Sequence, residues 1–434
     1  MNKLKKDKTY NAALKVVNEL QSTGHTAYFV GGIVRDMLLG VESKDIDIVT
    51  SALPDVVDSL FKRTHHIGAA FGIINVVEQG INFEVATFRE EREYNDGRHP
   101  EEVHYTTDPK LDAVRRDFTI NGMFYNPVTE EIHDFVNGQA DLKRGILTTI
   151  DDPEIRFKED YLRMMRAVRF SNRFGFTLDP NTATAITKFS ENVTKLSAER
   201  VRDELSKMLT GQRPAQSLIQ LEQLGILTHI LPQVSALTEI QDPHQTNRSL
   251  FESCIQMLQH MAVPSIELAW SIMLRNLGTT DSSTTIADTA QLAEQIMKEM
   301  RFSKKETVAV VEAISSKLQF DTIHEKPRAH WRRIMSRNNF PIELELYRID
   351  CLCHTKTLAN YELMLERVHL NKYDLKLPKP LLTGGNLIQM GFKPGPHFSK
   401  LITTLMNKQL NEEITTKQQA LTWANGQKKS PSSI

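Results

Sequence analysis

The fold of this chain is decided by the stretch Gly31-Gly32-Ile33-Val34-Arg35-Asp36, which is followed nine residues later by Asp45-Ile46-Asp47. A short apolar and aromatic run at residues 27–30 precedes it and predicts a β-strand. The two glycines permit a sharp turn and a close approach of phosphate, which a Cβ atom would block. Residues 34–39 are then predicted to be helical, with Gly40 as the stop.

The second part of this stretch places two carboxylates on one face of a strand. In residues 45–49 the side chains alternate, so that Ile46 and Ile48 point to the core while Asp45 and Asp47 share the opposite face. Two adjacent carboxylates repel one another unless a cation lies between them, and Mg²⁺ prefers such oxygen ligands. Taken alone, the motif favours a half-exposed edge strand with acidic outer residues. Its position after the glycine turn favours a metal site for phosphoryl chemistry.

A third motif, Arg115-Arg116-Asp117-Phe118-Thr119-Ile120-Asn121, follows further along the chain. Two guanidinium groups can clamp a triphosphate, while Asp117 and Asn121 can hydrogen-bond ribose hydroxyls. An isolated motif of this kind is more often a solvated helix turn. Its place after the carboxylate pair favours nucleotide binding.

In this order the motifs resemble the signature of the class II tRNA nucleotidyltransferase and bacterial poly(A) polymerase family. The resemblance is strong over residues 26–208 and patchy beyond them, and Gly122 stands where the family usually has alanine. It implies that Asp45 and Asp47 hold two Mg²⁺ ions, which activate a 3′-hydroxyl and steady the leaving pyrophosphate. It also implies CTP and ATP as substrates, and it assigns Gly31, Gly32 and Arg35 to the nucleotide.

The motif Glu159-Asp160-Tyr161-Leu162-Arg163 resembles the family's nucleotide-selecting element. The run at residues 161–170 predicts a helix, and Glu159, Asp160 and Arg163 are expected on one edge of it. A carboxylate and a guanidinium complement the amine and ring nitrogen of cytosine and adenine, whereas guanine and uracil reverse this pattern. Asp160 and Arg163 are therefore expected to select the base, with Arg166 also at the nucleotide. An ordinary surface ion pair is the alternative.

Supporting residues are expected around these motifs, and Glu159 is one of them. Glu199 and Arg200 resemble the element that braces the nucleotide-selecting helix, and Glu84 is expected to be a carboxylate behind the metal ligands. The charged segment at residues 89–98 predicts a flexible loop, which in relatives that add the terminal A helps to switch the pocket from CTP to ATP. Its candidate residues are Arg89, Tyr94, Asp96 and Arg98.

Composition agrees with a protein that contacts RNA through one end. The 434 residues are 40% hydrophobic and 25% charged, and the formal net charge is −1. Residues 361–434 carry ten Lys or Arg against five Asp or Glu, so this tail has a charge of +5 and the remaining chain −6. A basic tail suits the phosphate backbone of a tRNA acceptor stem and 3′ end, although a solvated surface would also explain it.

The remaining compositional signals concern location. Three cysteines, Cys254, Cys351 and Cys353, are too few for a disulfide framework and fit a reducing cytoplasm. Zinc binding by Cys351-Leu352-Cys353-His354 is disfavoured because the segment is predicted to be helical and lacks a second ligand pair. No run is long and apolar enough to span a membrane, and no apolar signal core follows the N-terminus.

The predicted fold class is α+β. A small mixed β-sheet nucleotidyltransferase head, similar to polymerase β, precedes an all-helical neck, body and tail. The expected boundaries are 1–142, 143–212, 213–325 and 326–434. The body resembles an HD phosphohydrolase module in the spacing of its hydrophobic residues. It has Arg275-Asn276 where the His-Asp metal ligands would fall, so a structural role is expected.

The predicted activity is template-independent addition of CMP and AMP to a tRNA 3′ end. Addition of the terminal A alone and poly(A) synthesis remain alternatives within the family. From other classes, a noncatalytic RNA-binding relic is disfavoured by the crowded carboxylates, and a small-molecule nucleotidyltransferase is disfavoured by the long helical part. The sequence leaves the oligomeric state open.

Overall fold

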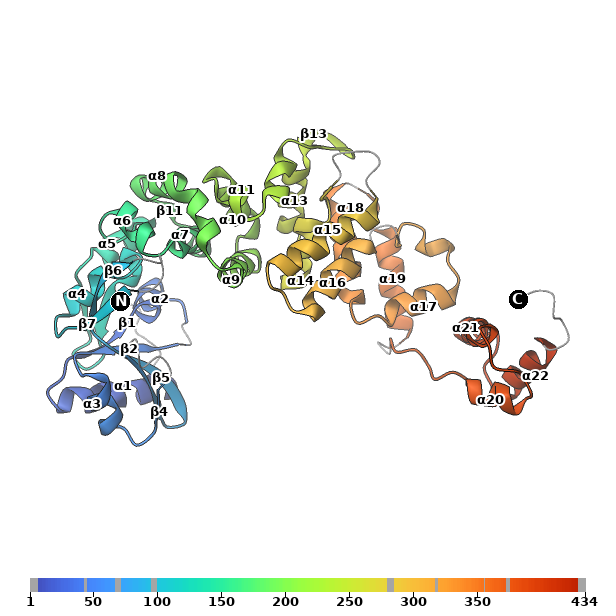
Figure 1. Ribbon diagram of the computed structural model, residues 1–434, viewed down its shortest axis with the longest axis horizontal. Coiled ribbons are helices and arrows are strands. Elements are labelled where there is room, and N and C mark those ends of the chain that lie inside the picture. Colours follow the sequence, from blue (N-terminus) through green and yellow to red (C-terminus); the bar gives the residue numbers. More distant parts are fainter. Residues whose placement is uncertain are drawn as a thin grey trace. The chain divides into compact units, whose positions relative to one another are not determined.

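The computed structural model describes residues 7–42, 45–66, 72–94, 100–278, 285–316, 319–354, 356–371 and 375–427. The chain divides into two compact units, residues 1–235 and 236–434, which are described separately (Figure 1). The finer division into head, neck, body and tail stays a prediction.

A seven-stranded mixed sheet forms the N-terminal part of the first unit, as predicted. Its strand order is β3-β4-β5-β2-β1-β8-β9, and β2 and β5 run parallel while the other neighbours are antiparallel. The strands are β1 (Ala27–Val30), β2 (Asp47–Thr50), β3 (Thr64–His65), β4 (Ile73–Glu78), β5 (Ile81–Thr87), β8 (Met123–Asn126) and β9 (Glu131–Asp134).

The two faces of the sheet have different coverings. Helices α1 (Lys8–Ser22) and α3 (Pro54–Leu60) pack on one face, where the Tyr10 ring meets the edge of Phe29 at 5.7 Å. On the other face Val30 and Val49 join a buried cluster with Ala113 of α4 (Pro109–Val114). Because side chains alternate along β2, Asp47 lies on this second face, beside the cluster.

Helix α2 (Gly32–Leu39) begins at the glycine turn, two residues earlier than predicted, and ends at Gly40. Gly31 has φ +72°, a conformation that a residue with a Cβ atom rarely adopts. Gly122, the departure from the family pattern, is explained by packing. A Cβ atom there would lie 2.8 Å from Val136 Cγ2 and 2.9 Å from Ile150 Cδ1, so these side chains already fill the space.

The prediction of a loop at residues 89–98 is wrong for its first half. Residues Arg89–Tyr94 form β6, which pairs with β7 (Pro100–Tyr105) as a two-stranded antiparallel ribbon. Their charged composition disfavours a strand, but the ladder with β7 satisfies the backbone and overrides that weak preference. The expected residues Asp96 and Arg98 lie outside the described part of the chain.

The rest of the first unit is mainly helical, as expected. Helix α7 packs against α9 and α10, and Pro residues occupy the first helical position of α6, α8 and α10. A short parallel pair joins β10 (Ile146–Leu147) to β11 (Thr177–Leu178). The elements are η2 (Thr119–Asn121), α5 (Gly138–Arg144), α6 (Pro153–Glu159), α7 (Leu162–Phe174), α8 (Pro180–Phe189), η3 (Ser190–Lys195), α9 (Ala198–Leu209), α10 (Pro214–Gln223), α11 (Ile226–Ile230) and α12 (Pro232–Ser235).

In its described residues the second unit has helices and one hairpin, of β12 (Gln241–Asp242) and β13 (Gln245–Ser249), which was not predicted. Capping boxes start α13, α15 and α16, where the side chains of Ser249, Thr285 and Ser303 accept backbone hydrogen bonds. Its remaining elements are η4 (Ala236–Thr238), α13 (Leu250–Gln259), α14 (Ile266–Leu274), α15 (Ile286–Glu299), α16 (Lys304–Ser315), η5 (Ile323–Glu325), α17 (Arg328–Met335), α18 (Phe340–Cys353), α19 (Ala359–Leu370), α20 (Gly384–Gln389), α21 (His397–Leu410) and α22 (Lys417–Gln427).

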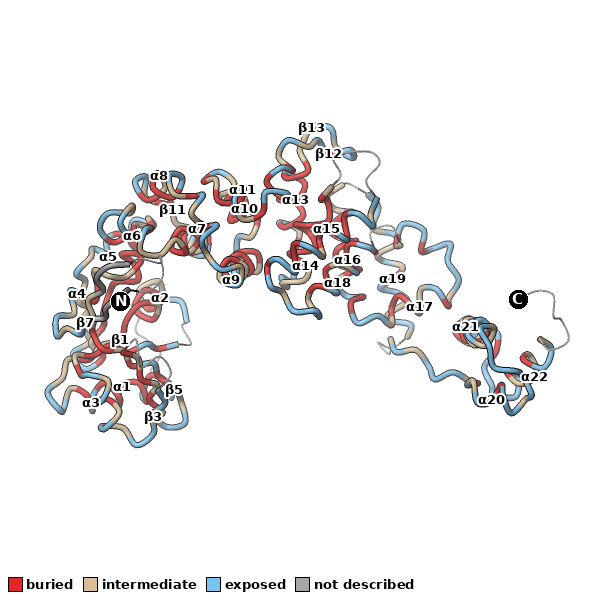
Figure 2. The backbone as a smooth tube through the Cα atoms, viewed as in Figure 1, coloured by how far each residue is buried: buried red, intermediate tan, exposed pale blue. Residues whose placement is uncertain are grey.

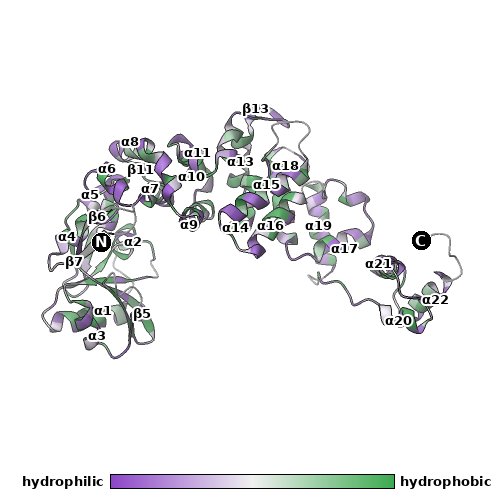
Figure 3. Cartoon of the chain, viewed as in Figure 1, coloured by the Kyte–Doolittle hydropathy of each residue, from purple (hydrophilic) through white to green (hydrophobic). Residues whose placement is uncertain are grey.

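Both units bury an apolar interior, seen as red stretches of the backbone in Figure 2 and as green stretches of the helices in Figure 3. In the second unit Cys351 packs in a core with Phe320 and Tyr347, and the predicted helix over Cys351 is confirmed. Asn386 serves as the capping partner of Thr383 at the start of α20. No helix in the described ranges is long and apolar enough to cross a membrane.

Candidate functional site

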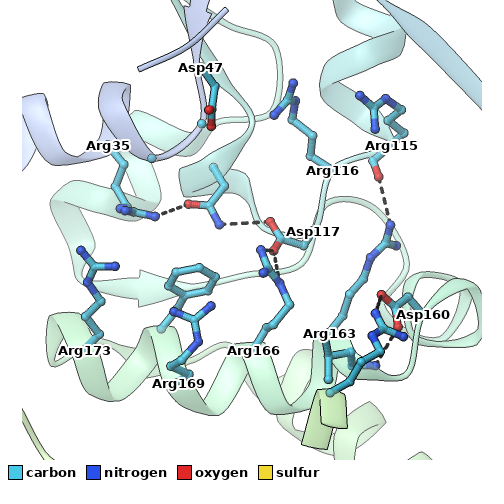
Figure 4. Close-up of a pocket in the computed structure, with 16 residues that line it drawn as sticks. Arg35, Asp47, Arg115, Arg116, Asp117, Asp160, Arg163, Arg166, Arg169 and Arg173 are labelled. Carbon is cyan, nitrogen blue, oxygen red and sulfur yellow. Dashed lines mark hydrogen bonds and ion pairs between the residues drawn. The ribbon is translucent and has the colours of Figure 1, made fainter. Parts of the chain in front are cut away.

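A pocket of about 490 Å³ in the first unit brings most of the predicted site residues together (Figure 4). One side of the pocket is formed by the glycine turn before α2 and by the start of β2, which carries Asp47. The other side is formed by α7. The predicted residues that line it are Gly31, Gly32, Arg35, Asp47, Arg115, Arg116, Asp117, Asn121, Asp160, Arg163, Arg166 and Arg200. Residues more than 130 positions apart therefore share one cavity.

Asp47, the first residue of β2, provides a carboxylate on the wall of the pocket that the sheet forms. Partial burial, the charge of Glu84 and that of Asp45 raise the pKa of Asp47, and Arg116 opposes the rise. Both aspartates keep solvent-accessible surface on either side of buried Ile46, although the surrounding protein partly desolvates Asp47, and Asp45 precedes β2 and is not part of it. Among the described residues no group of three His, Cys, Asp or Glu side chains is placed to hold a metal ion. The charge of Glu84 acts on Asp47.

The opposite wall of the pocket is a stripe of arginines on α7. Arg163, Arg166, Arg169 and Arg173 are spaced three, three and four residues apart, so they project from one side of the helix (Figure 4). Met164, Ala167 and Val168 bury the other side. From Arg163 to Arg173 the helix rises by ten residue steps, about 15 Å. Arg169 and Arg173 were missed in the sequence, although their helical spacing from Arg163 and Arg166 was a usable signal.

The charges of the pocket do not balance locally. In the described part of the chain its eight arginines form ion pairs with six carboxylates, because Asp36 and Asp112 each serve two of them, and Asp47 is a seventh carboxylate at the pocket wall. Guanidinium groups in excess over their partners attract an anion of several charges, such as a triphosphate. Glu159, which was predicted as a supporting residue, pairs with Arg163 and Arg156.

Asp117 lies at the centre of the pocket (Figure 4), where it forms a buried network with Asn121. Asp117 accepts from Asn121 Nδ2 at 3.0 Å and from Arg166 Nε at 2.9 Å, and Asn121 Oδ1 accepts from Arg35 at 2.5 Å. Burial alone would raise the pKa of Asp117, but the charge of Arg166 and these hydrogen bonds outweigh it and lower the pKa to about 2. Arg35 is buried and also pairs with Asp36 at 2.7 Å, so it positions Asn121.

The structure corrects the expectation that Glu159, Asp160 and Arg163 share one helix. Helix α6 ends at Glu159 and α7 begins at Leu162, which leaves Asp160 extended at the junction. Its Oδ1 accepts from the backbone N–H of Leu162 at 3.0 Å, because a short acidic side chain competes well for the free donors at a helix start. Its Oδ2 accepts from Arg200 of α9 at 2.7 Å.

Arg163 is held by backbone carbonyls on both sides of the pocket. Its Nη1 donates to Arg156 O at 3.1 Å, and its Nη2 donates to Arg115 O at 3.2 Å. It thereby fixes the distance between α7 and the loop that carries the two predicted triphosphate arginines. Glu199 is an exposed residue in the first turn of α9 and does not enter the pocket.

Asp112 is a buried residue that the sequence reasoning missed. Its carboxylate accepts from Arg115 Nη2 at 2.7 Å, from Arg116 Nη2 at 2.8 Å and from the backbone N–H of Arg89 at 3.3 Å. Burial opposes its ionisation, but the charges of Arg116 and Arg115 lower the pKa of Asp112. One carboxylate therefore connects the first residue of the β6–β7 ribbon to both arginines. Of Tyr94 only the backbone, in β6, is described.

Comparison with known proteins identifies relatives over nearly the whole chain. Residues 27–148 match the family described as poly A polymerase head domain, and residues 175–237 match the probable RNA- and SrmB-binding site of polymerase A. A CCA-adding enzyme of Levilactobacillus brevis is 31% identical over 95% of this chain and 96% of its own length. That of Staphylococcus haemolyticus is 42% identical over 51% of this chain and 55% of its own length.

Two solved structures of CCA-adding enzymes are similar in fold to nearly the whole chain. The crystal structure of the Bacillus stearothermophilus CCA-adding enzyme in complex with CTP has a TM-score of 0.76 and 25% identity, covering 98% of both chains. The Thermotoga maritima CCA-adding enzyme complexed with tRNA has a TM-score of 0.65 and 19% identity, covering 97% of this chain and 96% of its own, and shares the fold.

Proposed function

Because the chain belongs to the family of CCA-adding enzymes, we propose that it adds CMP and AMP to the 3′ end of tRNA without a nucleic-acid template. The observation that carries this proposal is the composition of one pocket. It joins Asp47 for the chemistry, an excess of arginines for the triphosphate, and Asp160 with Arg163 for the base. A noncatalytic RNA-binding protein would have no chemical need for this combination.

In the proposed reaction the 3′-hydroxyl oxygen of the tRNA attacks the α-phosphorus of CTP or ATP. The bond from that phosphorus to the bridging oxygen breaks, and pyrophosphate leaves with its electron pair. Arg115 and Arg116 are held by Asp112 at the pocket wall, where their positive charge offsets the charge of the triphosphate. The backbone at Gly31 and Gly32 allows the phosphates to approach closely, with the start of α2 directed at them.

Asp45 and Asp47 would hold the Mg²⁺ ions. The donor set fits, because partial burial and repulsion from the neighbouring carboxylates raise the pKa of Asp47, and the charge of a divalent cation would stabilise the ionised carboxylate against both effects. Mg²⁺ needs only one or two protein carboxylates when substrate phosphates and water complete its shell, so the lack of a third ligand in the described residues is no obstacle. When bound, the ions would activate the attacking hydroxyl and stabilise the leaving pyrophosphate.

Base selection is proposed to rest on Asp160 and Arg163. Asp160 would accept a hydrogen bond from the exocyclic amine of cytosine or adenine, and Arg163 would donate to the neighbouring ring nitrogen. The contact from Arg200 to Asp160 at 2.7 Å and the carbonyl contacts of Arg163 support this role, because both groups are oriented before a nucleotide binds. UTP and GTP would meet two mismatched contacts. Each leaves a buried polar group unpaired, which costs about 1–3 kcal/mol.

The RNA partner is proposed to be the acceptor stem and 3′ end of tRNA. The charge of +5 on residues 361–434 supports a contribution of the tail to phosphate binding. Asp112 supports a role for the β6–β7 ribbon in nucleotide choice, because it joins Arg89 to the triphosphate arginines. A location in the cytoplasm, where the substrates are present, stays an expectation.

The decisive experiment uses tRNA transcripts that end before CCA, after C and after CC, each with one labelled nucleotide. We expect CTP to be added to the first two transcripts and ATP to the third, with little UTP or GTP on any. An enzyme for the terminal A alone would use only the third transcript. A poly(A) polymerase would add many A residues to all three.

The base-selection role is tested with Asp160→Ala in the same assay. We expect CTP and ATP use to fall and the preference for CTP over UTP to shrink by about 10- to 100-fold, because the acceptor that distinguishes an amine from a carbonyl is removed. The matched control is Asp203→Ala, which removes an exposed aspartate of α9 outside the pocket. An unchanged ratio of CTP to UTP would assign selectivity to other residues.

A further inference from the structure

A second pocket, of about 400 Å³, adjoins the nucleotide pocket in the first unit and shares Arg169 and Arg173 with it. The C-terminal half of α7 provides one wall, and the end of α9 with the start of α10 provides the other. Its other charged lining residues are Lys207 and Arg213. The described lining therefore contains four cations and no acidic side chain.

The cations of this second pocket are only partly neutralised. Arg169 and Lys207 share the single carboxylate of Glu204. Arg173 is 3.8 Å from Asp36, and Asp36 already pairs with Arg35 at 2.7 Å. The side chain of Arg173 is 46% exposed. The guanidinium of Arg213 has no anionic partner in the described ranges of the chain. The excess positive charge predicts an anionic ligand.

Arg213 is positioned at this pocket by the backbone around it. Gly175, which follows the last residue of α7, has φ +70°, and a Cβ atom there would lie 2.6 Å from both terminal nitrogens of Arg213. The guanidinium therefore packs directly on the glycine backbone. The Oγ of Ser217 donates to the carbonyl of Arg213 at 2.9 Å, which fixes the start of α10. Both contacts hold the charge at the pocket.

We propose that this second pocket binds a backbone phosphate of the RNA strand close to its 3′ end, with Arg173 and Arg213 as the principal donors. The proposal rests on the proposed function, since the strand whose 3′-hydroxyl reacts in the first pocket must continue away from it. The α7 stripe connects the two pockets through Arg169 and Arg173. A phosphodiester carries one negative charge and can accept hydrogen bonds from two guanidinium groups. Contacts to the backbone do not depend on base sequence, so they suit a strand whose last bases change during CCA addition.

The test compares Arg213→Ala, Arg213→Glu and Arg213→Lys in the full chain. Affinity for tRNA lacking CCA is measured by fluorescence anisotropy without nucleotide at several salt concentrations, and KM is measured for tRNA and for CTP. We expect the Kd and KM for tRNA to rise about tenfold for Arg213→Glu and less for Arg213→Ala. For Arg213→Ala the slope of log Kd for tRNA against log salt concentration should decrease by about one, since one phosphate contact is lost. Arg213→Lys should retain most of the affinity, and KM for CTP should not change.

The matched control is Arg63→Glu, an exposed arginine of the same unit that lines neither pocket and undergoes the same change of charge. It should leave tRNA affinity within twofold. Thermal unfolding checks that the variants are folded, and if Arg213→Glu is not, the alanine variant and its salt dependence decide. Unchanged tRNA affinity in the folded variants would overturn the proposal.

Two further outcomes separate other sources of phosphate. A higher KM for CTP or weaker inhibition by pyrophosphate in Arg213→Glu, with unchanged tRNA affinity, would assign the pocket to the nucleotide or the leaving group and overturn the proposal. Because the binding assay contains no nucleotide, it is independent of turnover. If the wild-type protein binds tRNA through Arg213 but adds neither C nor A, the proposed function fails and the phosphate site stands.

Discussion

The nucleotide pocket of the first unit and a buried ionic cluster of the second unit contain similar residues in opposite settings. In the cluster Arg275 pairs with Asp350 at 2.9 Å, and both side chains are at most 5% exposed. Burial opposes ionisation of Asp350, but the charge of Arg275 and contacts from His354 and Lys356 lower its pKa. In the nucleotide pocket, by contrast, eight arginines form ion pairs with six carboxylates of the described residues around an open cavity.

The comparison shows that buried charge alone does not mark a functional site. Asp242 in the cluster accepts from Ser253 and from the backbone N–H of His244, and His354 lies between Asp242 and Asp350. Each carboxylate there has partners supplied by the chain itself. Arg275 stands where an HD module would have a metal ligand, and its guanidinium provides the positive charge beside Asp350. A binding site needs charge that other groups of the chain do not neutralise, and it needs space for a ligand beside that charge.

The largest difference between the two regions should be seen in catalysis. Asp47→Ala should lower kcat for CMP addition by about 10³-fold or more, because the carboxylate that would hold the metal is lost. The Kd for tRNA should change little, since phosphate contacts elsewhere supply most of the affinity. Asp55→Ala, an exposed aspartate in the first turn of α3, is the control and should keep normal turnover. A kcat within tenfold of the wild type would remove Asp47 from the site.

The buried cluster should respond in stability and not in chemistry. Arg275→Met leaves Asp350 buried with a weaker set of partners and should lower the free energy of unfolding by about 3–5 kcal/mol. All three tryptophans, Trp270, Trp331 and Trp423, belong to the second unit, so their fluorescence during urea unfolding reports on it. The kcat of the folded fraction should stay near that of the wild type.

Two controls sharpen this measurement. Combining Arg275→Met with Asp350→Leu should restore much of the stability, because no unpaired charge remains. Lys298→Met removes an exposed ion pair of α15 and should change stability by less than about 1 kcal/mol. A loss in Arg275→Met as small as that of Lys298→Met would show that the buried pair contributes little.

The smallest effect concerns acid sensitivity of the nucleotide pocket. The pKa of Asp117 is about 2 in the folded chain, against an ordinary value of 3.8. This depressed pKa stabilises the fold by about 2 kcal/mol above pH 4, and the contribution is lost as the pH falls through about 2. By calorimetry, Asp117→Asn should unfold at a lower temperature than the wild type at pH 5, and the gap should narrow toward pH 2. A gap independent of pH would contradict the ionised pair with Arg166.

Local sequence signals predicted the elements of the first unit well. The apolar run before Gly31 is a strand, Gly40 ends α2, and the alternation at Ile46 and Ile48 places Asp45 and Asp47 on the exposed side. The errors occurred where non-local pairing or a local side-chain contact overrides composition. The charged segment from Arg89 is a strand because β7 pairs with it, and Asp160 lies between α6 and α7, where its side chain accepts from the backbone N–H of Leu162.

The sequence by itself determined the order and chemistry of the motifs: a glycine turn, a carboxylate pair, an arginine pair and a base-selecting pair. These depend on residue type and short spacing, which physical preferences of the local chain decide. Tertiary structure alone decided that Asp112 joins Arg89 to Arg115 and Arg116, that Arg200 contacts Asp160, and that Arg169 and Arg173 form a wall shared by two pockets. Most of these groups come from separate elements, and their distances are set by how the helices pack on one another and on the sheet.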